Sequence, residues 1–561
     1  MKNNISRFAL HEEKDPIYFK NNQKRLNIRF NRIAFIFFIF FLISIIYSIH
    51  LFHLGSRNFK TEIPKNYHSL NKIQRANIVD RNDDFLAKTI NSIDVGINPV
   101  DVIDKKRLLL NLKYIFPNKN YHAINSKLEK NKFFWFEKRI SDEKYEKIMM
   151  LGDKAIKSHE NLIRVYPQKN LFSHIIGQID DNNFGISGLE KSLDNELKKN
   201  INPIKLTVDK DIQFLIRQEL LKYNEVFNTI GSAAILMDIH NGEIISIISL
   251  PDFNPNKREN IVDVNYINRA TKGVYELGSV FKTFTLAAAL NEGIISPDTK
   301  FQNLDKSINC GGNTISEYDK KIPSDLTAEE ILIRSGNIGS VRIGQSIGIE
   351  KFKEFLKNLD LTNPIKFDIE EIGQPIPFNW GKCKLATTSY GHGITTTILQ
   401  LANAYAIIGN GGFRISPTLI KKNSYLKGER ILSKDVSNNL IPILRKIVTT
   451  KEGTASLANV DGYEVAGKTG TAEKTNAGGY SRKKINTFAS IFPASNPKYS
   501  LVVMLDEPKT NSDYIYHYRD GSGIKYKGTP FNTAGWTTVE VTGQIIEKIG
   551  PILATKYIQV Y

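Results

Sequence analysis

The residues of this chain that are best suited to chemistry lie in three short segments, which begin at Ser279, Ser335 and Lys468. In the first segment Lys282 follows Ser279 by three positions, a spacing that places both side chains on one face of a helix. Gly278 allows a sharp turn into that helix, and the helix start places Ser279 near the positive end of the helix dipole. This pattern predicts a serine nucleophile beside a lysine that accepts its proton.

The three segments together contain the groups that an acyl transfer needs. Ser279 is the predicted nucleophile, and Lys282 can act as its base if burial and a nearby cation lower the pKa of the amine. Lys468 is the candidate for that cation. We expect Ser335 to relay a proton to the leaving amine and Asn337 to offer its amide to the substrate backbone.

The third segment, Lys468-Thr469-Gly470-Thr471, is expected on a strand, where it presents backbone N–H groups and alternate hydroxyls along one edge. The N–H groups of Ser279 and Thr471 are the predicted oxyanion hole. Each motif alone occurs by chance in many long chains, whereas all three in this order indicate a serine acyl-transfer site.

The elements around these motifs predict an α+β domain, in which helices pack against an antiparallel sheet. Residues 233–238 and 243–248 flank Asn241-Gly242 and predict a hairpin with a tight turn. Residues 488–492 and 501–505 predict a second strand pair, and residues 539–549 predict a last amphipathic helix. The helix opened by Ser279 is expected to be amphipathic and to end at Gly293; its apolar positions are Phe281, Phe284, Leu286 and Leu290.

One apolar stretch, Ile33 to Phe52, contains no Asp, Glu, Lys or Arg and is long enough to cross a membrane. Its bulky residues continue without a small-x-small cleavage site, which favours an uncleaved anchor over a signal peptide. Basic residues are more frequent in the twenty positions before it than in the twenty after it, which predicts that the short tail lies inside. These residues are Lys14, Lys20, Lys24, Arg25, Arg29 and Arg32 against Arg57, Lys60, Lys65 and Lys72.

The composition is that of a globular protein of two or more domains, with 561 residues, 41% of them hydrophobic, and a net charge of +18. Scattered Lys and Arg without a recognition motif favour solvated faces, and we expect no nucleic-acid partner. Cys310 and Cys383 are the two cysteines. They lack a metal-ligand spacing, and the sequence leaves open whether they pair or remain buried thiols.

The chain resembles the class B penicillin-binding proteins, the single-span transpeptidases that cross-link peptidoglycan, and most of all their cell-division (FtsI-type) branch as found in alphaproteobacteria. The resemblance extends from about residue 73 to the C-terminal region. Besides the three motifs, it depends on Ile78-Val79-Asp80-Arg81-Asn82, Gly185-Ile186-Ser187-Gly188-Leu189-Glu190, Leu206-Thr207-Val208-Asp209, Ser389-Tyr390-Gly391-His392-Gly393, the run from Gly462 to Ala472, Asp506-Glu507-Pro508 and Thr533-Ala534-Gly535-Trp536.

This resemblance implies a penicillin-binding fold with helices on both sides of the sheet, a transmembrane helix and an elongated pedestal. We expect a cytoplasmic tail at 1–32, a membrane helix at 33–54, a periplasmic, dimerisation-like pedestal at 55–205 and a transpeptidase domain at 206–561. The protein is then expected in the inner membrane at the division septum.

The implied reaction attacks the D-Ala-D-Ala amide of a stem peptide through Ser279 and passes the acyl group to the side-chain amine of a neighbouring stem. Thr469 and Thr471 would hold the terminal carboxylate, with Gly470 between them. β-Lactams would acylate the same serine, no metal or organic cofactor is expected, and the implied protein partners are an FtsW-type glycan polymerase and other division proteins.

The chain departs from the family pattern at several positions. His392 replaces a more usual tyrosine near the rim of the expected site, where it could titrate or bind substrate, but we expect a packed structural histidine. Residues 508–532 form a long polar segment that could contact substrate or a partner, but that we expect to be a mobile surface loop. Ala76 and Asp83 stand where the family usually has glycines, and Leu277 and Val280 flank Ser279 without carrying the chemistry.

Three other interpretations share parts of the pattern. A β-lactamase or antibiotic sensor has the serine and lysine motifs, but more often lacks a spacer and a retained anchor. The elongation branch of the same family differs in its partners and not in its chemistry. A scaffold without catalysis is the third, and the intact Ser279, Lys282, Ser335, Asn337 and Lys468 argue against it.

Overall fold

The computed structural model describes residues 34–52, 74–257, 264–425, 428–476 and 479–556. Internal contacts divide the chain into two units, Met1–Lys72 and Ile73–Tyr561. Among the described residues, the helix Ala34–Phe52 is the one helix that is long and apolar enough to cross a membrane. It falls within the predicted span 33–54, while Ile33, His53, Leu54 and the predicted tail 1–32 lie outside the described residues.

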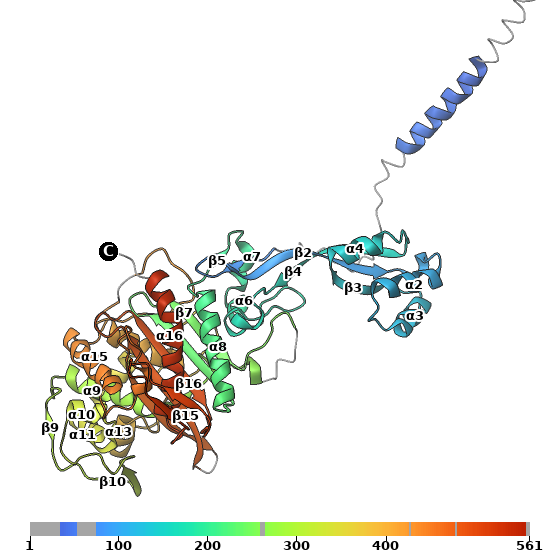
Figure 1. Cartoon of the computed structure of the whole chain (residues 1–561). Coiled ribbons are helices and arrows are strands. Elements are labelled where there is room, and N and C mark those ends of the chain that lie inside the picture. Colours follow the sequence, from blue (N-terminus) through green and yellow to red (C-terminus); the bar gives the residue numbers. More distant parts are fainter. Residues whose placement is uncertain (1–33, 53–73, 258–263, 426–427, 477–478, 557–561) are drawn as a thin grey trace, which may run out of the picture. The chain divides into compact units, whose positions relative to one another are not determined.

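The N-terminal part of the second unit is built on β2 (Phe85–Ile97), which pairs antiparallel with β3 (Phe134–Ile140) and β4 (Ile156–Val165). Leu108 and Leu112 share a small, separate core with buried residues of these strands. Three helices accompany the strands in this part (Figure 1): α2 (Lys105–Ile115), α3 (Tyr121–Glu129) and α4 (Asp142–Met149).

Two of the short motifs that carry the resemblance meet where this part joins the larger domain. Strand β1 (Ile78–Val79) pairs antiparallel with β2 and parallel with β5 (Ile204–Lys205). The Arg81 guanidinium then donates to the carbonyl oxygen of Thr207 at 2.6 Å and to the carboxylate of Glu243 at 2.7 Å. The motif around Arg81 therefore links the pedestal to the sheet of the larger domain.

A buried ion cluster supports the same junction. Glu190 lies in α6 (Gly188–Ser192) with no exposed side-chain surface. Its two carboxylate oxygens pair with Arg75 at 2.8 Å and with Arg164 at 2.6 Å, and both guanidinium groups are buried as well. Because buried charges are costly unless paired, this cluster fixes three distant segments relative to one another.

The larger domain contains a five-stranded antiparallel sheet in the order β14-β15-β16-β6-β7. Its strands are β14 (Ala466–Asn476), β15 (Gly479–Phe492), β16 (Tyr499–Asp506), β6 (Gly231–Asp238) and β7 (Ile244–Leu250). Both predicted strand pairs are confirmed, since β6 pairs with β7 and β15 with β16. The first pair turns at Gly242, whose φ of 77° suits a glycine.

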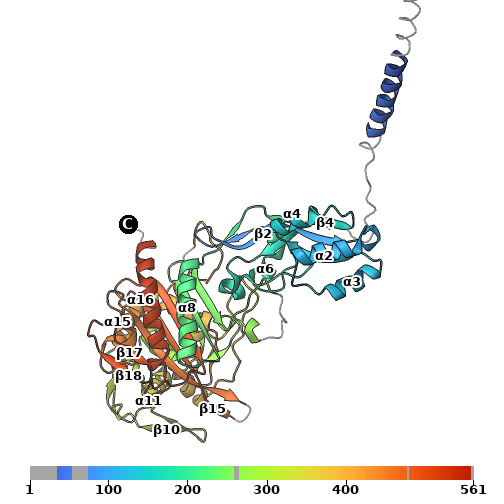
Figure 2. The same ribbon diagram turned by 45° about the vertical axis from the view of Figure 1, so that its right-hand side comes forward.

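Helices cover the sheet on both sides, as the predicted α+β class requires. Helices α8 (Lys210–Val226) and α16 (Thr538–Lys556) lie side by side across one face (Figures 1 and 2). Helix α14 (Ile398–Gly409) packs against β6, β15 and β16, and every one of its residues is buried. A helix that is apolar all round is typical of a position inside a core.

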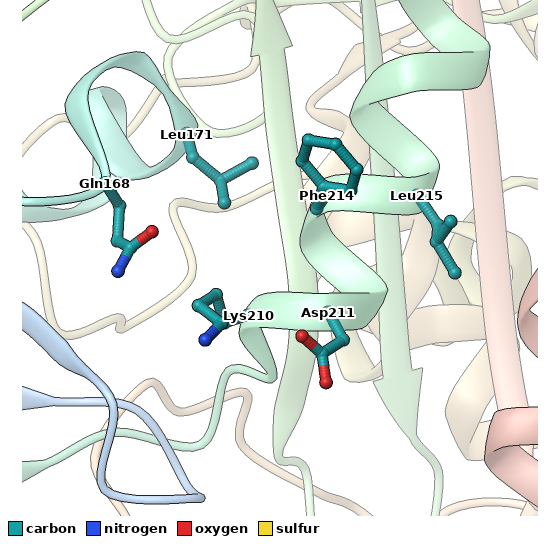
Figure 3. A pocket seen from close by; sticks show the side chains of 6 residues that line it. All are labelled: Gln168, Leu171, Lys210, Asp211, Phe214 and Leu215. Carbon is teal, nitrogen blue, oxygen red and sulfur yellow. The ribbon is translucent and has the colours of Figure 1, made fainter.

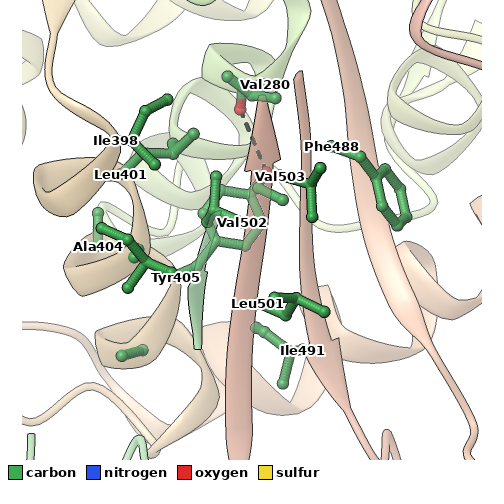
Figure 4. Close-up of a cluster of buried hydrophobic side chains, with 14 of the residues drawn as sticks. Val280, Ile398, Leu401, Ala404, Tyr405, Phe488, Ile491, Leu501, Val502 and Val503 are labelled. Atoms are coloured by element: carbon green, nitrogen blue, oxygen red, sulfur yellow. Dashed lines mark hydrogen bonds between the residues drawn. The ribbon is translucent and has the colours of Figure 1, made fainter. Parts of the chain in front are cut away.

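The main core lies where α14 meets the sheet and the turn that contains Ser279 (Figure 4). Ile398, Leu401 and Ala404 face side chains of β15 and β16. Tyr405 lies fully buried in this cluster and donates to the carbonyl oxygen of Val280 at 3.4 Å. The core therefore supports the backbone directly after Ser279.

The predicted amphipathic helix after Ser279 differs from the prediction in two ways. It is α9 (Lys282–Asn291), which begins at Lys282 because Ser279 lies in the preceding 3-10 turn η4 (Gly278–Phe281). Its residues 282–289 are all buried, so it has no solvent face. The reason is that four further helices pack around it: α10 (Ala328–Ile333), α11 (Asn337–Ile347), α12 (Ile349–Asn358) and α15 (Lys434–Thr449).

The predicted mobile surface loop 508–532 is mostly exposed, as expected, but parts of it pack against the domain. It contains the hairpin of β17 (Ile515–His517) and β18 (Lys525–Lys527). Tyr516 is fully buried and donates to the carbonyl oxygen of Trp536 at 2.7 Å. Arg519 pairs with the buried Glu540 of α16 at 2.7 Å. These aromatic and ionic contacts fasten a segment whose composition is polar.

The two cysteines form a disulfide, which settles the question that the sequence left open. Cys310 ends β10 (Ser307–Cys310), which pairs with β11 (Asn313–Ser316) in a hairpin. Cys383 lies in α13 (Lys382–Ser389), 73 residues further on. The bond therefore ties the tip of the hairpin to a helix that leads into the segment containing His392.

Candidate active site

Ser279 lies in a turn between a short strand and the central helix α9. Strand β8 (Tyr275–Glu276) pairs with β13 (Thr395–Thr396), and the 3-10 turn follows at once. Gly278 has a φ of 62°, and a Cβ atom there would lie 2.7 Å from the carbonyl oxygen of Thr471. Only glycine permits this conformation and this approach together, so the half-buried Ser279 lies beside strand β14.

Lys282 is buried at the start of α9, with its amine directed into a cluster of polar atoms. It donates to the carbonyl oxygen of Ser335 at 2.5 Å and to Oδ1 of Asn337 at 2.7 Å, and it lies 3.2 Å from Oγ of Ser335. Burial lowers the pKa of Lys282 to about 7, against a smaller opposing effect of Glu317. An amine with this pKa can accept a proton near neutral pH.

Ser335 and Asn337 occupy the link between α10 (Ala328–Ile333) and α11. Ser335 adopts a φ of 58°, an uncommon conformation for a residue with a side chain. The conformation directs its carbonyl oxygen and hydroxyl towards the two lysines, while Asn337 begins α11. Strain of this kind persists where the surrounding contacts hold it, which is common at functional sites.

Lys468 reaches the same cluster from strand β14. Its fully buried amine donates to Oγ of Ser335 at 2.8 Å, the oxygen that also contacts Lys282. Burial first, and the neighbouring charge of Lys282 second, hold the pKa of Lys468 well below its usual range. Two buried amines that share one hydroxyl favour a state in which at least one is neutral.

The remaining residues of the third motif line the edge of β14. Thr469 is largely buried, and its hydroxyl is 2.7 Å from the hydroxyl of Thr454. The hydroxyl oxygen of Thr471 accepts from the backbone N–H of Ala534 at 3.0 Å and retains its own hydrogen. Gly470 packs on the turn, since a Cβ atom there would lie 2.1 Å from the carbonyl oxygen of Leu277.

The structure thus brings the five residues predicted as catalytic, Ser279, Lys282, Ser335, Asn337 and Lys468, to one place at the edge strand. Thr469, Gly470 and Thr471 lie on the same strand beside the turn of Ser279. Three parts of the chain that are up to 190 residues apart therefore form one constellation. A polar cluster of this composition can transfer protons to and from a serine hydroxyl.

Sequence reasoning missed two supporting residues. Glu317 accepts hydrogen bonds from the backbone N–H groups of Asn337 and Ile338, although it precedes Asn337 by 20 residues. Thr454 contacts the hydroxyl of Thr469. No local motif marks either residue, and an acidic residue that caps a helix is ordinarily sought within the first turn of that helix.

His392 packs on aromatic rings, as expected of a structural histidine, but it is not fully enclosed. Its side chain is 39% exposed and lies between the rings of Tyr390 and Tyr480, with centroid distances of 5.7 and 4.4 Å. Nδ1 is 3.9 Å from the carboxylate of Glu276, three residues before Ser279. Burial lowers the pKa of His392, and Glu276 opposes this effect. The ring is therefore part of a half-exposed aromatic rim.

A cavity of about 270 Å³ lies elsewhere in the molecule (Figure 3). It is open to solvent and lies between the turn η2 (Lys169–Phe172) and the N-terminal half of α8, with Leu171 and Phe214 among its apolar walls. Helix α8 packs on β6 and β7, at the end of the sheet away from β14. This cavity therefore does not belong to the constellation of Ser279.

Comparison with protein families gives two matches along the chain. The model of the penicillin-binding protein dimerisation domain matches residues 71–220, and that of the penicillin-binding protein transpeptidase domain matches residues 232–521. The second match alone covers just over half of the chain. The chain therefore belongs to the class B penicillin-binding proteins, and its fold is theirs.

Within this class, the individual relatives that match the chain include FtsI-type members. The probable peptidoglycan D,D-transpeptidase FtsI of Caulobacter vibrioides is 30% identical over 498 residues, which cover 86% of this chain and 82% of the relative. The peptidoglycan D,D-transpeptidase FtsI of Buchnera aphidicola subsp. Schizaphis graminum is 30% identical over 481 residues, with coverages of 79% and 83%.

A solved structure shares the fold at lower identity. The apo form of penicillin-binding protein 3 from Mycobacterium tuberculosis has a TM-score of 0.64 and 23% identity, and the match covers 87% of this chain and 98% of that chain. At this identity the likeness extends to the fold alone.

Proposed function

We propose that this protein is the septal peptidoglycan D,D-transpeptidase of its cell, which cross-links stem peptides through an acyl-Ser279 intermediate. The observation that carries the proposal is the hydrogen-bonded cluster of Lys282, Ser335, Asn337 and Lys468 beside the turn of Ser279. The transpeptidase domain and the FtsI-type relatives support the same activity and its place in division.

In the first half of the reaction, the neutral amine of Lys282 takes the proton of the Ser279 hydroxyl. Oγ of Ser279 forms a bond to the carbonyl carbon of the D-Ala-D-Ala amide, and the backbone N–H groups of Ser279 and Thr471 stabilise the oxyanion. The C–N bond then breaks, and the leaving D-alanine amine receives a proton from the cluster through the hydroxyl of Ser335.

In the second half, the side-chain amine of a neighbouring stem attacks the ester carbon. The amine gives up a proton to the cluster, the C–O bond to Ser279 breaks, and the serine oxygen regains a proton from Lys282. One amide bond has been exchanged for another, so the reaction needs no cofactor. Asn337 is assigned to the substrate backbone, and Thr469 and Thr471 to its terminal carboxylate, with Gly470 keeping the strand close to the turn.

β-Lactams are proposed as inhibitors of the same serine. Two solved structures of penicillin-binding protein 3 from Mycobacterium tuberculosis are complexes with aztreonam and ampicillin, which supports this proposal through the shared fold. Opening of the lactam amide by Ser279 leaves the amine tethered to the acyl group. Because no leaving group departs, we expect a long-lived adduct.

The location follows from the apolar helix Ala34–Phe52, which we assign as the single membrane anchor. In this assignment residues 1–32 lie in the cytoplasm, 33–54 span the inner membrane, and the pedestal 55–205 and the transpeptidase domain 206–561 lie in the periplasm at the septum. The family matches at 71–220 and 232–521 support this division. A glycan polymerase of the FtsW type and other division proteins are the proposed partners.

The test is covalent labelling of the purified full-length protein by a fluorescent penicillin, followed by gel and intact mass. We expect a stable adduct in the wild type and in Ser346→Ala, an exposed serine, and none in Ser279→Ala. Rapid release of the label would identify a β-lactamase instead. A folded wild type without label would favour a non-catalytic scaffold, and either result would refute the proposed activity.

A further inference from the structure

The carboxylate of Glu317 is bound to the first turn of helix α11. Oε2 accepts from the backbone N–H of Asn337 at 2.7 Å, and Oε1 accepts from that of Ile338 at 2.9 Å. The N-cap residue of this helix is Gly336, which has no side chain to satisfy these donors. A carboxylate in this place makes two charge-assisted hydrogen bonds and lies at the favourable end of the helix dipole.

The same segment also fixes the side chain of Asn337. Its Nδ2 donates to the carbonyl oxygen of Ser316 at 2.8 Å, while its Oδ1 accepts from Nζ of Lys282 at 2.7 Å. Ser316 and Glu317 are consecutive, so the end of strand β11 holds both the backbone and the amide of Asn337. With Nδ2 occupied on one side, Oδ1 must face the amine.

This arrangement determines where the amine of Lys282 can accept a proton. A neutral amine has two hydrogens and one lone pair, and two carbonyl oxygens, those of Ser335 and Asn337, accept its hydrogens. The lone pair then remains for a hydroxyl group, either that of Ser335, which lies 3.2 Å from the amine, or that of Ser279 one turn earlier. The orientation of the Asn337 amide therefore sets the direction in which Lys282 acts as a base.

The charged groups around Lys282 come from two further elements. Glu317 after β11 raises the pKa of Lys282 against the larger lowering by burial, and Lys468 on β14 shares Oγ of Ser335 with it. On the side of α14, Tyr405 contacts the neighbouring Thr283 at 2.9 Å. Glu317 is thus the anion that acts on this amine.

We propose that Glu317 is a positioning residue for acyl transfer, which holds Asn337 and, through it, the amine of Lys282 in the geometry for proton transfer from Ser279. The proposal rests on the proposed transpeptidase function. It adds a residue that no motif contains and that need not touch the substrate. It also assigns a role to the hairpin β10–β11, whose base holds Asn337 while its tip is bonded to α13 through Cys310.

The test compares the rate of acylation by a fluorescent penicillin from pH 5.5 to 9 in full-length protein. In Glu317→Gln the amide can accept one N–H but opposes the other with its own donors, and the anion is lost. We expect the limiting rate to fall on the order of tenfold to a hundredfold. The midpoint of the pH profile should move to lower pH, because the anion that raised the pKa of Lys282 is gone.

Two matched variants separate positioning from charge. Glu317→Asp keeps the anion but is too short to reach both N–H groups, so its rate should fall while its midpoint stays near that of the wild type. Asp319→Asn removes a carboxylate two residues away, which bonds the backbone N–H of Lys321, and should leave both quantities unchanged. If Glu317→Gln does not fold, by circular dichroism, Glu317→Asp alone decides the question of positioning.

Acylation of both Glu317 variants at the wild-type rate would overturn the proposal. A wild-type rate in Glu317→Asp alone would also overturn it, since an anion that cannot reach both N–H groups would then be sufficient. These outcomes differ from failure of the proposed function, in which the wild type itself shows no label that depends on Ser279.

Discussion

At the scale of residues, burial converts an ordinary lysine into a base. Lys282 is fully enclosed, and its pKa falls to about 7 because the charged form loses its hydration. Its partners are two carbonyl oxygens and a serine hydroxyl, so a neutral amine is well accommodated. In the proposed reaction, Lys282 accordingly needs no histidine to activate Ser279.

The pH dependence of acylation follows from this value. Lys282 must be neutral to take the proton of Ser279, so the rate should fall about tenfold per pH unit well below pH 7 and level off above it. The measurement is the second-order rate constant for penicillin labelling across this range. A rate that is constant from pH 5.5 to 9 would exclude Lys282 as the base.

At the scale of elements, a turn and a strand meet at a distance that only glycine allows. Gly278 in the turn η4 approaches the backbone of Thr471 on β14, and this contact sets the spacing between the serine and the edge strand. The sequence predicted the turn at Gly278, but the partner of the turn became apparent only from the fold.

Gly278→Ala therefore should displace the turn from β14. A Cβ atom 2.7 Å from a carbonyl oxygen forces a shift of backbone, and we expect acylation to slow on the order of a hundredfold. Gly293→Ala is the control, because Gly293 has a similar φ of 64° but open space around it. That variant should lose about 1–2 kcal/mol of stability and keep its acylation rate. Equal acylation rates in the two variants would contradict the argument.

The disulfide is a second link between elements, since it joins the hairpin β10–β11 to α13. Its two cysteines are 73 residues apart, and loss of a bond across such a loop should lower the free energy of unfolding by about 2–4 kcal/mol. The measurement is denaturant unfolding of the wild type and of Cys310→Ser with Cys383→Ser, each with and without a reductant. The reductant should destabilise only the wild type, and an equal response of both proteins would argue against the bond.

At the scale of the whole molecule, buried charges join the pedestal to the domain that follows it. Glu190 pairs with Arg75 and Arg164 at the junction, and none of these side chains reaches the constellation of Ser279. The junction and the reaction site are therefore separable by mutation. A mutation at the junction should therefore change the stability of the protein without changing its acylation rate.

Glu190→Gln leaves the buried Arg164 without its anion and Arg75 with Asp194 alone, which should cost about 3–5 kcal/mol in stability. Glu370→Gln is the control, because Glu370 pairs with Lys191 at the surface, where such pairs contribute roughly 1 kcal/mol or less. Thermal and denaturant unfolding measure both changes, and penicillin labelling of the folded fraction should stay near the wild-type rate in each. Equal stability of the two variants would contradict the assigned role of the cluster.

The sequence by itself determined the features that depend on neighbouring residues. The spacing of Ser279 and Lys282, the apolar helix within 33–54 and the hairpin β6–β7 follow from helical periodicity, hydrocarbon thickness and turn chemistry. The order of the three motifs was also sufficient to predict an acyl-transfer site, because that chemistry requires few residue types.

Only the tertiary structure decided the contacts between distant segments. Glu317 reaches Asn337 across 20 residues, and the burial of residues 282–289 of α9 depends on the four helices around it. Likewise, the segment 508–532 is polar in composition but is fastened by Tyr516 and Arg519. The conformational preferences of neighbouring residues do not predict such pairings. The pairings depend on which elements pack together and on which buried polar groups then need hydrogen-bond partners.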